Sequence, residues 1–286
     1  MFKRNEKNGV CFYTSPALEK YGIIHGFFTR HGGVSKEDFD SLNVSTARKD
    51  RNGNLDNPKN VFENYRFALS ALGSVPERAV SAKQVHENTV LRVTDGDCAR
   101  GINPNLPEMS SCDGLFLDGT ANEIDALCVK TADCVPILLS SKDGKEVSAV
   151  HAGWRGTVSD IVTKAAEKFT CEKEDILCAI GPCIGVCCYE VGEEVYEAVK
   201  ELFAYKGMED KTDSMFRNVC TCSANTKKKA NLSEINRQLL INFGIPEENI
   251  DVSGICTCCN DNEFFSHRAS GGFSGTFPSI IKQNSN

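Results

Sequence analysis

Residues 135–151 read VPILLSSKDGKEVSAVH, two apolar runs joined by a short polar segment. An Asp-Gly pair between apolar runs is a strong signal for a β-hairpin, and here the pair is Asp143-Gly144. If these two residues form a two-residue turn, the strands pair symmetrically about it and His151 lies opposite Pro136. The segment therefore predicts two adjacent antiparallel strands, with His151 close to the end of the second.

Cys134 immediately precedes the first of these strands. It lies two residues before Pro136, and side chains two residues apart in a strand point to the same face of the sheet. Because Pro136 lies opposite His151, the side chains of Cys134 and His151 are expected on the same face. The two residues would be diagonal neighbours, about 7–8 Å apart at the backbone. A thiolate and an imidazole at that spacing suit a metal such as zinc. A bulge would turn one of them away, and a buried cysteine would then simply lie beside a histidine.

Glycine-rich and polar segments flank this pair. His151 is followed by AGWRGT (152–157), which places a Trp, an Arg and two glycines at a predicted strand-to-helix turn. Such a turn lets the backbone approach a ligand, and a helix N-terminus favours an anion; alternatively, Trp154 packs in the core. The stretches KQVH (83–86) and KTADC (130–134) add further polar residues next to predicted strands. These segments are candidates for a binding site.

Groups of strands alternate irregularly with helices along the chain. Helices are expected at Val61–Leu72 after a polar loop at Lys49–Asn60, at Val158–Phe169, at Glu193–Phe203, and from an N-cap at Asn231 to a stop at Gly244. Strands are expected at Gly22–Thr29, Val90–Thr94, Ala126–Lys130, Val135–Ser140, Glu146–His151, Ile176–Ile180 and Ile250–Gly254. This order favours an α+β fold, a layered sandwich of mixed β-sheets flanked by helices, in one domain over residues 1–286.

The composition excludes several classes of protein. The 286 residues carry a formal net charge of −7, which is unfavourable for binding nucleic acid. No apolar stretch approaches the ~18–20 residues that span a membrane, and the first residues lack the apolar core of a signal peptide. We therefore expect a cytoplasmic protein. Its 15 cysteines, an odd number, are expected to be mostly reduced and buried.

Five segments, in order, resemble the motifs of the YfiH-like laccase-domain family. They are KQVH (83–86), CDGL (112–115), TADCVPI (131–137), HAGWRGT (151–157) and GPCIGVCCYEVG (181–192). TRHGGVS (29–35) and FFSHR (264–268) are similar to the motifs of that family near its two ends. The family was formerly described as multicopper polyphenol oxidases and is now described as purine nucleoside phosphorylases with adenosine deaminase activity. The resemblance covers nearly the whole chain.

The resemblance implies a zinc site and an anion site. The zinc ligands of the family fall on His86, Cys134 and His151, and an arginine of its pocket falls on Arg30. Phosphate needs cations, for which Arg30, Lys83 and Arg155 are candidates. His267 stands where the family usually has an aromatic residue, and we expect it to tune the pocket without binding the metal. Asp133 adjoins a ligand and could either move protons or cap a turn.

Zinc is favoured over copper by the donors. A multicopper oxidase uses many histidines, often in His-x-His pairs, whereas this chain has five histidines and no such pair. A single copper centre with two histidines and one cysteine stays open, although its ligands usually lie closer together in the sequence than Cys134 and His151. Three N/S donors with an open position are typical of catalytic zinc. Zinc could activate a water to convert adenosine to inosine, while phosphate would cleave adenosine, inosine or methylthioadenosine.

Two other classes of function remain open. Cys134 and His151 could form the nucleophile and base of a cysteine hydrolase. Alternatively, a fourth ligand from Cys256-x-Cys258-Cys259 or Cys220-x-Cys222 would make the zinc structural and the protein a binding module. The expected partners are a purine nucleoside and phosphate, with no nucleic acid and no membrane, and the oligomeric state is left open.

Overall fold

Two six-stranded sheets pack face to face in the computed structural model, which describes residues 1–219 and 227–284. In spatial order, the first sheet contains β1 (Lys3–Lys7), β2 (Val10–Thr14), β3 (His25–Phe28), β15 (Phe277–Lys282), β7 (Ala126–Thr131) and β4 (Ala79–Ser81). The second contains β14 (Ile250–Val252), β10 (Ile176–Ile180), β8 (Val135–Ser141), β9 (Val147–Ala152), β6 (Gly114–Leu117) and β5 (Val90–Arg92). Both sheets mix parallel and antiparallel pairs.

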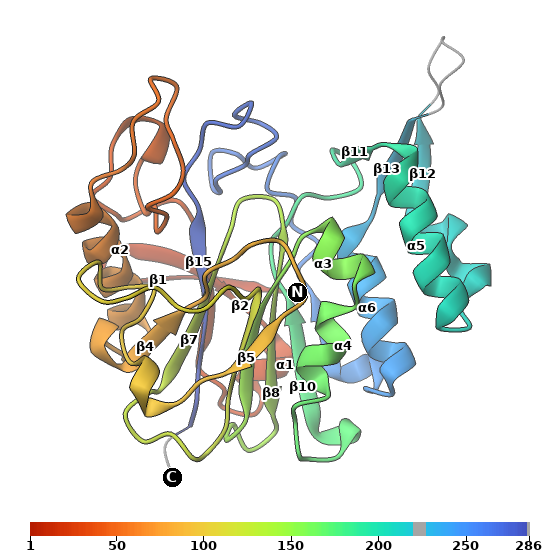
Figure 1. Cartoon of the computed structure of the whole chain (residues 1–286), viewed down its shortest axis with the longest axis horizontal. Helices are drawn as coiled ribbons and strands as arrows, with labels where there is room; N and C mark the ends of the chain where they lie inside the picture. Colours follow the sequence, from red (N-terminus) through yellow and green to blue (C-terminus); the bar gives the residue numbers. More distant parts are fainter. Residues whose placement is uncertain (220–226, 285–286) are drawn as a thin grey trace.

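Helices cover the outer faces of the two sheets (Figure 1). Helix α2 (Pro58–Ala71) packs on the first sheet, and α4 (Ile161–Ala166) and α6 (Leu232–Phe243) pack on the second. Beyond them lie α5 (Glu193–Tyr205) and a small sheet of β11 (Glu190–Val191), β13 (Lys227–Ala230) and β12 (Phe216–Val219), while α1 (Pro16–Glu19) and α3 (Trp154–Val158) are short. The arrangement confirms the predicted sandwich of mixed sheets flanked by helices.

Alternating side chains of each strand fill two different cores. In β7, Leu127 and Val129 face the second sheet, whereas Ala126 and Cys128 face α2. In β8, Leu138 faces the first sheet and Ile137 faces the helices on the other side. Because both faces of these strands are buried, their sequences are continuous apolar runs without polar alternation.

The predicted hairpin forms with the predicted register. Pro136 pairs with His151, but the loop contains four residues, 142–145, where a two-residue turn was expected. The last register pair of the two strands is Ser140 with Val147, and beyond it the Ser141 N–H donates to the Glu146 carbonyl at 2.9 Å. The longer loop has the same centre as the predicted turn, so the pairing of every other residue is unchanged.

Two predicted helices differ in extent. Helix α2 begins at Pro58, inside the segment expected to be a loop, because the Asn57 side chain caps it by accepting the Lys59 N–H at 3.0 Å. Of the helix expected at Val158–Phe169, only α4 (Ile161–Ala166) forms beyond the last residue of α3, because the left-handed backbone of Asp160 (φ +59°) separates α4 from α3.

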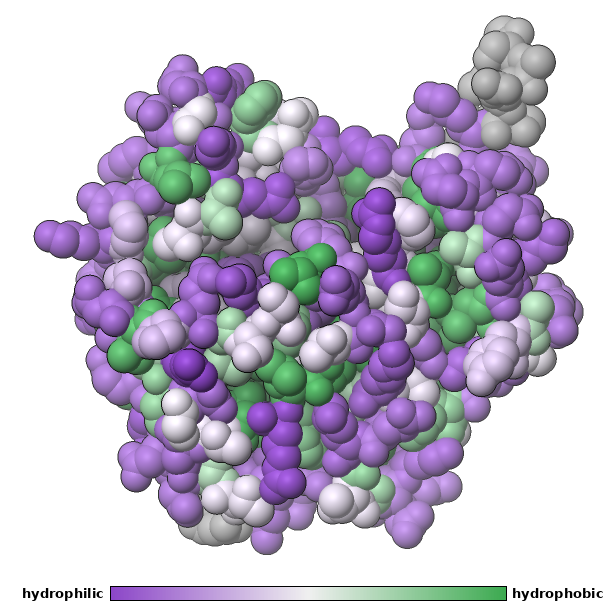
Figure 2. Space-filling view, viewed as in Figure 1, coloured by the Kyte–Doolittle hydropathy of each residue, from purple (hydrophilic) through white to green (hydrophobic). Residues whose placement is uncertain are grey.

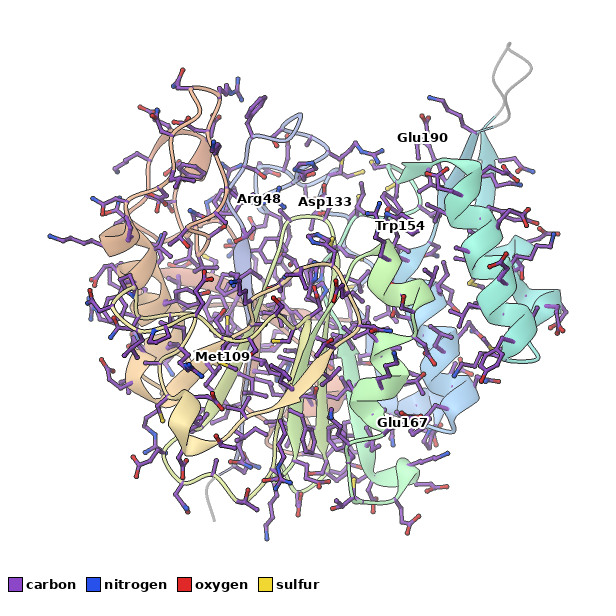
Figure 3. The ribbon with its side chains drawn as sticks, viewed as in Figure 1. Arg48, Met109, Asp133, Trp154, Glu167 and Glu190 are labelled. Atoms are coloured by element: carbon purple, nitrogen blue, oxygen red, sulfur yellow. The ribbon has the colours of Figure 1, made fainter. Side chains whose placement is uncertain are left out.

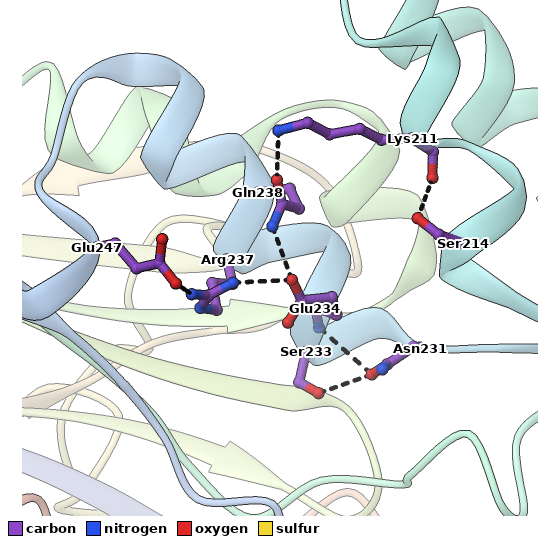
Figure 4. Close-up of polar contacts among 8 residues, drawn as sticks. All are labelled: Lys211, Ser214, Asn231, Ser233, Glu234, Arg237, Gln238 and Glu247. Carbon is purple, nitrogen blue, oxygen red and sulfur yellow. Dashed lines mark hydrogen bonds and ion pairs between the residues drawn. The ribbon is translucent and has the colours of Figure 1, made fainter.

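Helix α6 has the termini that the sequence predicts. Asn231 accepts the Glu234 N–H at its start (Figure 4). Gly244 (φ +113°) ends it. Within the described residues, no helix is both long and apolar enough to cross a membrane.

Candidate active site

The chain passes from the first sheet to the second through residues 132–134. This short connection joins β7 to β8 and contains Asp133, whose backbone has a φ of +88°. The Asp133 carboxylate accepts hydrogen bonds from the Thr257 hydroxyl at 2.6 Å and from the Arg268 backbone N–H at 2.7 Å. Both of its oxygens are therefore held by protein donors, as expected for a residue that fixes the corner.

Three side chains meet at this corner and form what we call the metal trio: His86, Cys134 and His151. Their ligand atoms all lie within 4.8 Å of one another, and the two imidazole rings are perpendicular with centroids 4.9 Å apart. Cys134 precedes β8, His151 lies in β9, and His86 lies in the turn after β4 with a φ of +63°. The structure thus brings together the three residues that the resemblance implied. They offer two imidazole nitrogens and one sulfur as donors.

Asp113 organises the trio from behind. This fully buried carboxylate accepts the backbone N–H groups of Val85, His86 and Glu87 at 3.1, 3.0 and 2.8 Å, and the His151 Nδ1–H at 2.7 Å. The last bond directs Nε2 of His151 toward the other donors, an arrangement typical of histidines that bind metals. Sequence reasoning gave Asp113 no role. Its only signal was a place in the CDGL motif.

Electrostatics favour a charged pair at the site. Burial raises the pKa of the Cys134 thiol, but His151 and His86 outweigh it and lower that pKa to about 6. Burial lowers the pKa of His151, but Cys134 and Asp113 outweigh it and raise that pKa to about 9. Burial also raises the pKa of Asp113, while His151 and the backbone donors hold it below its usual value. The Cys134 thiolate and the Asp113 carboxylate thus place two negative charges around His151. These charges can be balanced either by a bound cation or by a proton on His151.

The space around the trio fits a metal ion. A Cβ on Gly153 would lie 3.3 Å from Cys134 Sγ and 3.3 Å from His86 Cδ2, so a side chain there would crowd the donors. A mixed set of two imidazoles and one thiolate, open toward a cavity, matches catalytic zinc. None of the described residues that line this cavity is a methionine, which a blue-copper centre normally uses as its axial ligand.

The trio lies on the wall of a cavity of about 850 Å³. Figure 2 shows a hollow in the upper middle of a mainly hydrophilic face, and in Figure 3 Arg48 and Trp154 lie on either side of Asp133 in the same region. The charged side chains that line the cavity are mainly cationic: Arg48, Lys83, Lys130, Arg155 and Arg268, against Glu108 and Asp133. A cavity of this size and charge can hold an anionic or phosphate-containing ligand together with an aromatic base.

Two of the three predicted phosphate-binding residues line the cavity. Lys83 does so while paired with Glu108 at 2.6 Å, and the Arg155 guanidinium stacks on the Trp154 ring at 4.4 Å. Arg30 is not among the lining residues. Its guanidinium donates to the carbonyl oxygens of Asp40 and Asp261, each at 2.8 Å, and lies over the Phe265 ring. This placement gives no support to a phosphate contact by Arg30.

The remaining candidates lie outside the trio. His267 lines the cavity, where its Nδ1 lies 3.1 Å from the Arg48 guanidinium, and it is not among the grouped ligand atoms. Cys256 and Cys259 join a separate cysteine group, so neither supplies the trio with a fourth ligand. Cys220 and Cys222 lie outside the described residues.

Comparison with known proteins agrees with these observations. Residues 24–284 match the family model described as multi-copper polyphenol oxidoreductase laccase. A protein of Bacteroides thetaiotaomicron named purine nucleoside phosphorylase is 32% identical over 270 residues, covering 93% of each chain. One named adenosine deaminase, from an unknown prokaryotic organism, is 34% identical over 217 residues, covering 74% of this chain and 78% of that one.

A solved structure has the same fold. The crystal structure of YlmD from Geobacillus stearothermophilus covers 99% of both chains with a TM-score of 0.85 and 30% identity. In both sequence and fold, therefore, the chain belongs to the multi-copper polyphenol oxidoreductase laccase family, the family of the YfiH and YlmD proteins.

Proposed function

We propose that this protein is a zinc-dependent purine nucleoside phosphorylase that acts on adenosine, inosine and methylthioadenosine and also deaminates adenosine. The observation that carries the proposal is the metal trio, three nitrogen and sulfur donors that converge on the wall of a large cationic cavity. The relatives named purine nucleoside phosphorylase and adenosine deaminase support this choice of reactions.

The protein's own residues would have distinct tasks. His86, Cys134 and His151 would hold zinc, which when bound supplies a Lewis acid able to activate water or polarise a substrate. Asp113 orients His151 through the 2.7 Å hydrogen bond to Nδ1. Trp154 and Tyr189, the aromatic residues that line the cavity, offer faces against which a purine could stack.

The cationic side chains would bind the second substrate. In phosphorolysis a phosphate oxygen forms a bond to C1′ of the ribose while the bond from C1′ to the purine nitrogen breaks. Arg155 and Lys83 line the cavity and could neutralise the phosphate, and Arg48 adds a third cation that the sequence analysis did not identify. Deamination needs water and no phosphate, so the two reactions should depend differently on these cations.

One observation favours a second candidate, a cysteine hydrolase. The lowered pKa of Cys134 and the raised pKa of His151 describe a thiolate next to an imidazolium, which is also the ground state of a Cys–His dyad. A copper-dependent polyphenol oxidase has less support, because only two of the five histidines join the trio and the described cavity lining contains no methionine.

A single set of incubations tests the proposal. Purified protein is incubated with adenosine, inosine or methylthioadenosine, with and without phosphate, and the products are separated. Free base should form only with phosphate, inosine should form from adenosine without it, and a chelator should abolish both until zinc is returned. Phosphate-independent release of free base after complete zinc removal, together with loss of that activity on thiol alkylation, would instead identify the hydrolase.

A further inference from the structure

Four cysteines outside the cavity form a second group, which we call the cysteine cluster: Cys187, Cys188, Cys256 and Cys259. Their sulfur atoms all lie within 4.8 Å of one another. The Cys259 sulfur is 3.5 Å from that of Cys187 and 3.4 Å from that of Cys188. Cys187 and Cys259 are exposed, so an ion can reach the cluster from solvent.

These separations suit a shared metal ion. A tetrahedral zinc with bonds of about 2.3 Å to sulfur places neighbouring sulfurs about 3.8 Å apart, whereas a disulfide requires about 2.05 Å. Cys256 and Cys259 are also separated by two residues, the spacing of structural zinc sites. Sequence reasoning overlooked this spacing, because Cys258 lies between them.

The surrounding backbone is arranged for thiolates. The Gly185 N–H donates to the Cys256 sulfur at 3.2 Å. A Cβ on Gly185 would lie 3.2 Å from the Cys187 sulfur, so a glycine allows the main chain to approach the cluster closely. A hydrogen bond from a backbone N–H to a sulfur stabilises the charged form of the cysteine, which is the form that binds metals.

Two cations lie beside the cluster. Lys229 Nζ donates to the carbonyl oxygen of Cys187 at 2.6 Å, and Arg268 Nη1 donates to that of Cys188 at 3.0 Å. Four thiolates on a divalent ion carry a net charge of −2, and adjacent positive side chains lower the cost of that charge.

We propose that Cys187, Cys188, Cys256 and Cys259 bind a second zinc ion in a closed structural site. Four protein ligands leave no open position, so the site would stabilise structure and perform no chemistry. It would join the loop before β11 to the loop after β14, which are already linked where the Thr257 N–H donates to the Cys183 carbonyl at 3.0 Å. Tyr189, next to Cys188, lines the cavity, so this zinc would hold one cavity wall in place.

Metal analysis of the full-length protein tests this proposal independently of the proposed activity. Protein expressed in medium that contains zinc should hold two zinc ions per chain, as measured by elemental mass spectrometry. The double variant Cys187→Ser/Cys259→Ser changes two exposed residues and should retain one zinc. Cys134→Ser should also retain one, held by the cluster, and Cys258→Ser is the matched control, which should retain two.

A second measurement identifies the ligands. In the Cys134→Ser protein loaded with cobalt, the visible spectrum should be that of four sulfur ligands, and Cys187 and Cys259 should react slowly with a thiol reagent until a chelator is added. Equal zinc content in the wild type and in Cys187→Ser/Cys259→Ser would overturn the proposal. So would iron in place of zinc, or a disulfide within the cluster found by peptide mapping under non-reducing conditions.

Discussion

Replacing Asp113 with asparagine tests how the metal trio is positioned. The carboxylate accepts four hydrogen bonds at a site with no solvent exposure. Asparagine has one acceptor oxygen, and its NH₂ group would face two of the four donors. Each buried donor left without an acceptor costs about 1–3 kcal/mol, so we expect Asp113→Asn to destabilise the protein by about 2–6 kcal/mol. For a chain of 286 residues the Tm should fall by roughly 3–10 °C.

Metal affinity provides the second readout for Asp113→Asn. Loss of a hydrogen-bond partner of a metal-binding histidine typically weakens binding about 10- to 100-fold, which a competition titration with a chromophoric chelator can measure. Asp118→Asn is a suitable control, because Asp118 directly follows the other end of the same strand, β6, where its partly exposed side chain pairs with Arg92. It should cost about 1 kcal/mol or less and leave zinc affinity unchanged. An Asp113→Asn protein with normal stability and normal zinc affinity would refute the positioning role.

Three further predictions concern the trio, acid stability and Arg30. Gly153→Ala should weaken zinc binding by crowding Cys134, whereas Gly119→Ala, whose Cβ would meet no atom within 4 Å, should bind normally; equal affinities would contradict the fit argument. Burial lowers the pKa of His25 to about 4, so the unfolded chain binds one more proton than the folded chain as the pH falls from 6.5 to 4. The free energy of unfolding, measured with urea, should therefore fall by about 3 kcal/mol over this pH range, and the His25→Asn variant should not show this loss. Arg30→Ala should lower the Tm without changing the ratio of free base to inosine formed from adenosine, and a selective loss of free base would return Arg30 to the phosphate site.

The hairpin shows what the sequence could predict about the site. Pairing the two strands symmetrically about Asp143-Gly144 was sufficient to predict that Cys134 lies near His151. The prediction holds although the loop is longer than expected. His86 could be assigned only through the resemblance. It lies far from both partners in the sequence, on a turn with no regular periodicity.

Other features left no pattern that could be interpreted. The partners of Arg30 are main-chain carbonyls, which any residue can supply. Asp160 takes a left-handed conformation between α3 and α4, within a segment whose amphipathic pattern predicts a continuous helix. The cysteine cluster forms because β10 and β14 are parallel neighbours, so that the loops that follow them meet at the same edge of the second sheet. This pairing of distant strands is a property of the tertiary fold.

The position of β15 has a consequence for the aggregation of the chain. In the first sheet it lies between β3 and β7, where Ser279 pairs with both Phe27 and Val129. Without residues 277–282, the facing edges of β3 and β7 would have no partner strand. Such edges favour association with other chains, and pairings this distant in sequence form slowly. Chains that lack this strand should therefore aggregate more readily than chains that contain it.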